Sequence, residues 1–190
     1  MKHSFVVYVV LLACFIYDIR GSVAALTCGY KGTDLSPLQQ KSFVIHKTLV
    51  NVSTEWHFTV CGSNLLHCNE SQFNWPPSQA PDRKLYPIGS LVEVYNWNPK
   101  YKSCNILGQY KESFVSWKTD SDGQIVLNMQ GGSPAQCRIP GDSTNTDVVF
   151  VCGKNVVPDE KEIDVYLTRD CTNRVVFPTS LVCSNSTSNV

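Results

Sequence analysis

The sequence predicts an all-β domain stapled by disulfides, with the shape of a flattened β-barrel or sandwich of two antiparallel sheets. Three observations lead to this fold class. Several short segments alternate apolar and polar residues with the period of a β-strand, and no segment carries a long apolar stripe of helical period. Eight of the nine cysteines follow residue 25, and an even number in a chain of this size is typical of a disulfide framework.

Four segments are expected to form strands. Residues 55–61 (EWHFTVC), 124–130 (QIVLNMQ) and 162–168 (EIDVYLT) alternate, so one face of each strand is apolar. Residues 147–152 (DVVFVC) are an apolar run, which predicts a strand covered on both faces. An Asp-Gly pair within residues 118–124 predicts a hairpin turn. The residues expected on the apolar faces are Trp56, Phe58, Val60, Ile125, Leu127, Met129, Ile163, Val165 and Leu167.

The N-terminal segment predicts a secretory signal peptide. Residues 5–17 are apolar, and small residues follow within residues 1–25. Thirteen helical residues span roughly 20 Å, which is short of the roughly 30 Å core of a bilayer. An uncleaved anchor is the alternative. We therefore predict a mature chain without a membrane span, made of one domain over residues 26–184 and a polar tail over residues 185–190.

The cysteines and three glycosylation motifs predict a secreted protein or one in the lumen of the secretory or endolysosomal pathway. Asn-x-Ser/Thr sequons stand at Asn51, Asn69 and Asn185, and glycosylated sequons lie on the surface of secreted proteins. In an oxidising compartment all eight cysteines are expected to pair. These are Cys28, Cys61, Cys68, Cys104, Cys137, Cys152, Cys171 and Cys183.

Composition and motifs disfavour several classes of function. Sixteen basic and sixteen acidic side chains leave no net charge, which disfavours nucleic acid or an anionic membrane as the main partner. The glycine pair at 131–132 lacks the Lys-Ser/Thr of a phosphate loop, and His67 with Cys68 does not have the spacing of a zinc site. The acidic run at 159–164 is typical of a solvated connection, and the mature histidines accompany no nucleophile motif. We predict no enzyme activity, no metal and no cofactor.

Residues 69–103 form a segment rich in proline and aromatic residues, which is expected to be an insertion whose first half is a long loop. Trp75 and Trp97 either pack this segment onto the sheet or form a surface that contacts a partner.

Four stretches in chain order carry a resemblance to a known family. Residues 32–38 (GTDLSPL) resemble the opening of the repeats in the large cation-independent mannose 6-phosphate receptor, and residues 58–68 (FTVCGSNLLHC) resemble a strand of these repeats that ends in cysteine. Residues 125–137 (IVLNMQGGSPAQC), followed by 143–152 (STNTDVVFVC), are similar to the family's strand, Gly-Gly turn, cysteine, loop and F-x-C strand end. Residues 171–183 (CTNRVVFPTSLVC) are similar to its closing strand. The chain therefore resembles the mannose 6-phosphate receptor homology domain.

The resemblance implies the family's flattened β-barrel of two packed antiparallel sheets. It also implies a disulfide pairing that spacing alone leaves open among 105 possibilities. The implied disulfides are Cys28–Cys61, Cys68–Cys104, Cys137–Cys171 and Cys152–Cys183.

The residues that bind mannose in this family are not matched in strict register. Lectin members use a glutamine, an arginine, a glutamate and a tyrosine, because amide, guanidinium and carboxylate groups match adjacent sugar hydroxyls. The corresponding positions are Asn105, Thr144, Ile163 and Asn173.

Shifted matches leave an alternative open. Gln109 replaces the glutamine if its loop is shifted, and Glu162 replaces the glutamate with a shift of one residue. A cation would then have to come from Arg138 or Arg174. The candidate glycan-binding residues are therefore Asn105, Gln109, Thr144, Glu162 and Asn173.

The leading interpretation is a secreted or lumenal, non-enzymatic binding module of this family whose sugar site is degenerate and whose ligand is a protein. Some repeats of the large receptor bind no sugar, and one binds a peptide growth factor. The first alternative is a lectin for mannose or mannose 6-phosphate in lysosomal sorting or glycoprotein quality control. The second is a noncatalytic subunit of a glycan-processing enzyme.

Overall fold

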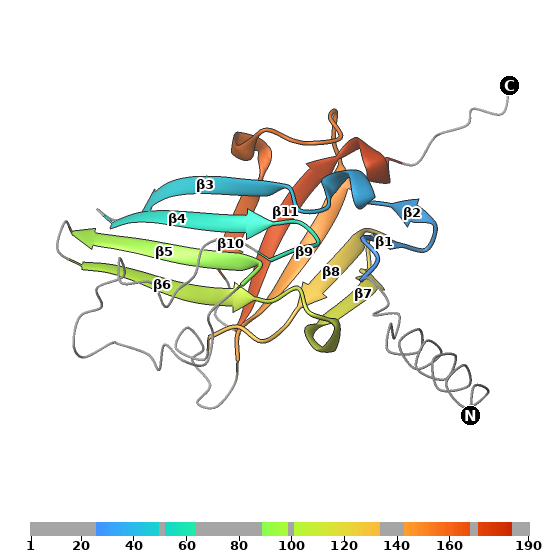
Figure 1. Cartoon of the computed structure of the whole chain (residues 1–190). Coiled ribbons are helices and arrows are strands. Elements are labelled where there is room, and N and C mark those ends of the chain that lie inside the picture. The colour runs from blue at the N-terminus through green and yellow to red at the C-terminus, as the bar shows by residue number, and fades with distance from the viewer. Residues whose placement is uncertain are drawn as a thin grey trace, which may run out of the picture.

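The computed structural model describes residues 26–49, 52–63, 89–98, 101–133, 143–167 and 171–183. These residues form an all-β fold, as the sequence predicts. Figure 1 shows a four-stranded sheet lying steeply across a five-stranded sheet, with a short hairpin beside them.

The strands and the three-residue 3-10 turns follow in chain order. They are β1 (Gly29–Tyr30), β2 (Thr33–Asp34), η1 (Ser36–Leu38), β3 (Ser42–Leu49), β4 (Val52–Thr59), β5 (Leu91–Asn98), β6 (Tyr101–Gly108), η2 (Glu112–Phe114), β7 (Val115–Thr119), β8 (Ile125–Met129), β9 (Asn145–Cys152), η4 (Glu160–Glu162), β10 (Asp164–Leu167), β11 (Thr172–Thr179) and η5 (Ser180–Val182).

The two large sheets differ in their topology. β3, β4, β5 and β6 form an antiparallel meander in chain order. The other sheet has the order β10-β11-β9-β8-β7, and its β11 runs parallel to β9. The prediction of two packed sheets is confirmed, but the five-stranded sheet is mixed rather than wholly antiparallel, and the described sheets form a sandwich rather than a closed barrel.

The sandwich stays open at one side because side chains, not a strand ladder, join β3 to the segment that carries β10. The Val44 backbone N–H donates to Glu160 Oε1 at 2.8 Å. The Lys47 ammonium donates to the Val165 carbonyl oxygen at 3.3 Å and lies 3.5 Å from the Asp164 carboxylate. The carboxylate and the ammonium thus stand in for the carbonyl and the amide that a neighbouring strand would supply.

An aromatic cluster fills the space between the sheets. Phe43 on β3 and Phe58 on β4 meet Phe150 on β9 and Phe177 on β11. The ring centroid of Phe177 lies 5.3 Å from that of Phe43, 6.0 Å from that of Phe58 and 5.7 Å from that of Phe150. Phe177 therefore touches both sheets, which makes it the centre of the core.

The predicted strands are confirmed at β4, β8, β9 and β10. Trp56 and Phe58 point into the core, while Glu55 and His57 lie on the outer face of β4. In β9 both Val148 and Val149 are buried, as expected for a strand covered on both faces. The predicted hairpin joins β7 to β8, where Gly123 has a φ of 78° and the Asp120 carboxylate accepts from two backbone N–H groups of the turn.

The predicted insertion contains regular structure in its second half. β5 and the first residues of β6 fall within residues 69–103, and both strands pair in the four-stranded sheet. Residues 91–98 contain no proline, a residue that cannot donate a backbone hydrogen bond to a neighbouring strand. Trp97 lies on β5.

Two of the implied disulfides, Cys28–Cys61 and Cys152–Cys183, are confirmed. Cys104 and Cys171 are also disulfide-bonded. The remaining features predicted from the sequence lie outside the described residues: the signal peptide 1–25, the tail 185–190, the sequons at Asn51, Asn69 and Asn185, the residues His67, Cys68, Trp75, Cys137 and Arg138, and the side chains of Trp97 and Leu167.

Candidate functional site

The position expected for the sugar-binding arginine is closed by the protein itself. Thr144 directly precedes β9, and its side chain is buried. Its hydroxyl lies 3.3 Å from the Ile106 carbonyl oxygen and 3.2 Å from the Ser133 carbonyl oxygen, so its single proton is already used within the protein. The Gly132 N–H donates to the Thr144 carbonyl oxygen at 2.9 Å, which fixes the backbone at this position.

Asn105 and Asn173 are each linked to Thr144 through one neighbouring residue. Asn105 precedes Ile106, whose carbonyl oxygen faces the Thr144 hydroxyl. Asn173 faces inward on β11, and its amide donates to the Asn145 carbonyl oxygen at 3.2 Å. Both asparagine side chains are buried. The structure therefore gathers three of the five candidate residues at one end of the sandwich.

The other two candidates serve local structure. The Gln109 side-chain amide donates to the Gly131 carbonyl oxygen. Glu162 is exposed at the start of β10, where its carboxylate accepts from the Asp159 backbone N–H in a capping box. Asn173 pairs with Leu167 at the far end of β10, so Glu162 is separated from the other candidates by the length of that strand. Ile163, which aligns with the lectin glutamate in strict register, is buried. Neither Ile163 nor Glu162 lies with Asn105, Thr144 and Asn173.

Arg174 does not supply the missing cation to this cluster. It alternates on β11 with the inward-facing residues Asn173 and Val175, and its exposed guanidinium lies 3.8 Å from the Asp120 carboxylate. A period of two along a strand sends adjacent side chains to opposite faces. Arg174 therefore lies on the outer face of the five-stranded sheet.

A buried carboxyl that the sequence interpretation missed lies in the same part of the four-stranded sheet. Glu93 on β5 stands in register with Trp56 on β4 and Asn105 on β6, and all three side chains are buried. The Trp56 indole N–H donates to Glu93 Oε1 at 3.2 Å. Alternation in residues 91–95 suggests that Val92 and Val94 face the core, but they lie on the opposite face of the sheet and are buried there as well.

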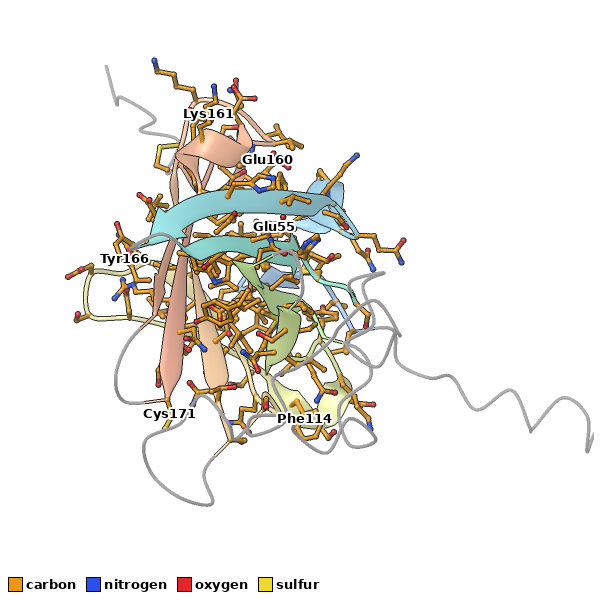
Figure 2. All side chains as sticks on the ribbon, turned by 90° about the vertical axis from the view of Figure 1, so that its left-hand side faces the viewer. Glu55, Phe114, Glu160, Lys161, Tyr166 and Cys171 are labelled. Atoms are coloured by element: carbon orange, nitrogen blue, oxygen red, sulfur yellow. A yellow bond between two sulfur atoms is a disulfide. The ribbon has the colours of Figure 1, made fainter. Side chains whose placement is uncertain are left out.

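A hollow of about 290 Å³ follows the open side of the sandwich. It lies beside the β3 edge, and Figure 2 shows Glu160 and Lys161 on η4 next to this edge, far from Cys171 at the other end of the five-stranded sheet. Its lining mixes both signs of charge: Val44, Ile45, His46, Lys47, Glu160, Lys161, Ile163 and Asp164.

The Glu160 carboxylate should stabilise the open edge modestly. We expect Glu160→Ala to lower the free energy of unfolding by about 1 kcal/mol, because the Val44 N–H loses its acceptor but gains water. Glu160→Gln retains an acceptor oxygen and should lose less than half of that. Urea unfolding of both variants measures the difference, and equal losses would show that the charge rather than the hydrogen bond matters.

Two histidines of the expected mature chain, His46 and His57, lie among the described residues, both on the four-stranded sheet. His57 Nε2 lies 3.4 Å from Glu55 Oε2, and the Asn96 amide donates to the other oxygen of Glu55 at 3.1 Å. His46 is exposed on β3. Within the same described ranges, no three His, Cys, Asp or Glu side chains are placed to hold a metal ion.

Comparison with known protein families gives no match, and no curated protein matches the chain. In the part of the chain that the structure describes, no helix has the length and apolar character needed to cross a membrane.

Proposed function

We propose that this protein is a non-enzymatic binding module resembling the mannose 6-phosphate receptor homology domain, with a degenerate sugar site and a protein as its ligand. Two observations support the resemblance. Two sheets pack face to face, and two disulfides, Cys28–Cys61 and Cys152–Cys183, follow the implied pairing. These disulfides also support a secreted or lumenal location, since such bonds persist in oxidising compartments.

The observation that carries the loss of sugar binding is the closed position of Thr144. A guanidinium at this position would offer several N–H groups to a sugar. The Thr144 hydroxyl has one proton, which two carbonyl oxygens of the protein already engage. Asn173 likewise donates its amide to a backbone oxygen. Within the described ranges no guanidinium joins these side chains, since Arg174 lies on the outer face of the five-stranded sheet.

A glycan array tests this proposal. The disulfide-intact protein, secreted from eukaryotic cells, should bind neither high-mannose nor phosphomannosyl glycans above background. Binding to terminal mannose that is lost in Asn105→Ala or Glu162→Ala would overturn the proposal in favour of a lectin.

The partner surface is tested by co-purification from the secretory pathway of the same cells. A specific protein partner should be lost in the double variant Trp75→Ala, Trp97→Ala. Tyr166→Ala is the matched control, because Tyr166 is an exposed aromatic residue on β10, with 52% of its surface accessible. A partner retained by the tryptophan variant would contradict the assignment of this surface, and a glycan-processing enzyme as partner would favour the subunit interpretation.

A further inference from the structure

Glu93 is a carboxyl group enclosed between the two sheets. It has no accessible surface, and it lies on the inner face of β5 between Trp56 of β4 and Asn105 of β6. Carboxyl groups are seldom fully buried, since removal of a charge from water is costly unless a partner compensates it.

The ionised form of Glu93 has little compensation. Oε1 accepts one hydrogen bond, from the Trp56 indole. Oε2 has no partner within hydrogen-bonding distance among the described residues. The side chains of Tyr95, Trp56 and Asn105, in that order, favour the charged form and lower the pKa. All three neighbours are neutral, so no ion pair within the described part of the chain balances a carboxylate here. Burial outweighs these contacts and raises the pKa of Glu93 to about 7.

The charged groups of the neighbouring described strands belong to other contacts. Lys47 on β3 lies over the Trp56 ring, 6.0 Å from its centroid, and its ammonium already contacts the Val165 carbonyl oxygen and the Asp164 carboxylate. His46, Glu55 and His57 lie on the outer face of the four-stranded sheet. The described side chains that face inward from β7 to β11 are apolar or neutral: Val115, Trp117, Ile125, Leu127, Met129, Thr146, Val148, Phe150, Val165, Asn173, Val175, Phe177 and Thr179.

We propose that Glu93 is a proton-operated latch at the centre of the four-stranded sheet. With its proton, the uncharged side chain fits between Trp56 and Asn105 and holds β4, β5 and β6 together. Loss of the proton leaves a negative charge between the sheets and loosens this region. The change reaches the neighbouring end of the sandwich, because Ile106, next to Asn105, bonds through its carbonyl oxygen to the Ser133 N–H at 2.6 Å and to the Thr144 hydroxyl.

The sign of the pH effect follows from proton binding. Between the ordinary value of 4.5 and about 7 the folded state holds a proton that the unfolded state has released. The stabilisation is complete below pH 4.5 and is lost as the pH rises through 7. The ratio of folded to unfolded protein should therefore fall roughly 50- to 100-fold between pH 5 and pH 8 from this group. The latch is closed in an acidic lumen and opens at neutral pH.

Glu93→Gln separates this effect from the other titrating groups. The amide copies the shape of the protonated carboxyl, so the ratio of folded to unfolded protein in the variant should exceed that of the wild type by only about fourfold at pH 5 and by roughly 300-fold at pH 8. Urea unfolding at both pH values gives the ratios, and the histidines cancel in the comparison. Glu112→Gln, at an exposed position on η2, is the matched control and should keep the wild-type pH dependence. A Glu93→Gln variant with the wild-type pH dependence would overturn the proposal.

Two measurements on the wild type keep the test decisive if the variant fails to fold. In a carbon-13 NMR titration of the glutamate carboxyls, one resonance should titrate near pH 7, and titration of every resonance below pH 5.5 would refute the latch. Hydrogen exchange should show additional opening of β4, β5 and β6, relative to β8 and β9, above pH 7. Uniform opening of both sheets would show that the group affects global stability without acting as a latch.

Discussion

Replacing Phe177 with alanine should lower the free energy of unfolding by about 3–5 kcal/mol. The ring is wholly buried on β11 and contacts Phe43 and Phe58 of the four-stranded sheet as well as Phe150 of its own sheet. Removal of the ring loses the stabilisation that its burial provides, and it leaves a cavity lined by strands from both sheets. Such walls cannot collapse without moving one sheet relative to the other, so the cost should lie in the upper part of the range for large-to-small substitutions.

Urea unfolding followed by tryptophan fluorescence measures this loss, and it should be done at fixed pH because Glu93 makes the stability depend on pH. Tyr166→Ala removes an exposed aromatic ring from β10 and should change the stability by less than about 1 kcal/mol. A loss below 2 kcal/mol for Phe177→Ala would mean that the two sheets repack independently and that Phe177 is not the centre of the core.

The strands that sequence periodicity predicts are those with one apolar and one polar face. In β4 the order Glu55, Trp56, His57, Phe58 alternates because one face meets the core and the other faces outward. The β7–β8 hairpin is predictable for a different reason, since the turn needs a residue with positive φ and Gly123 supplies it. In both cases the information is local, and a few neighbouring residues determine the structure.

The remaining strands depend on contacts that are distant in sequence. β5 carries Val92 and Val94 on one face and Leu91 and Glu93 on the other, and all four are buried. Alternation of polarity therefore points to the wrong face, and it hides a carboxyl in the interior. The parallel pairing of β9 with β11 likewise joins strands that are separated by the whole of η4 and β10, which short-range patterns do not specify.

The candidate site likewise contains residues that the sequence places correctly and a residue that it misplaces. The resemblance identifies Asn105, Thr144 and Asn173 as positions of interest, and the structure gathers them at one end of the sandwich. A one-residue shift makes Glu162 look equivalent in the sequence, but the direction of β10 carries it to the opposite end. Spacing along the chain gives the order of residues, whereas strand direction decides which of them meet.

Closure of the Thr144 position depends on a glycine, and Gly132→Ala should lower the free energy of unfolding by about 3 kcal/mol or more. A Cβ at Gly132 would lie 2.0 Å from Thr144 Oγ1 and 2.8 Å from the carbonyl carbon and oxygen of Leu107. These contacts are with backbone and a short, buried side chain, so relief requires the segment 131–133 to move away from β6. That movement would strain the bonds from Gly132 N–H to Thr144 and from Ser133 N–H to Ile106.

Gly123→Ala is the matched control because it tests the cost of the backbone conformation without any steric clash. Gly123 has a φ of 78° and no atom within 4 Å of an added Cβ, so its substitution should cost about 1 kcal/mol from the left-handed conformation alone. Gly132 is the reverse case, with no left-handed φ and no room. Equal losses in the two variants would mean that the segment 131–133 moves freely, and the Thr144 position would then be open to a ligand after all. A larger loss at Gly132 would show that tight packing keeps this position closed.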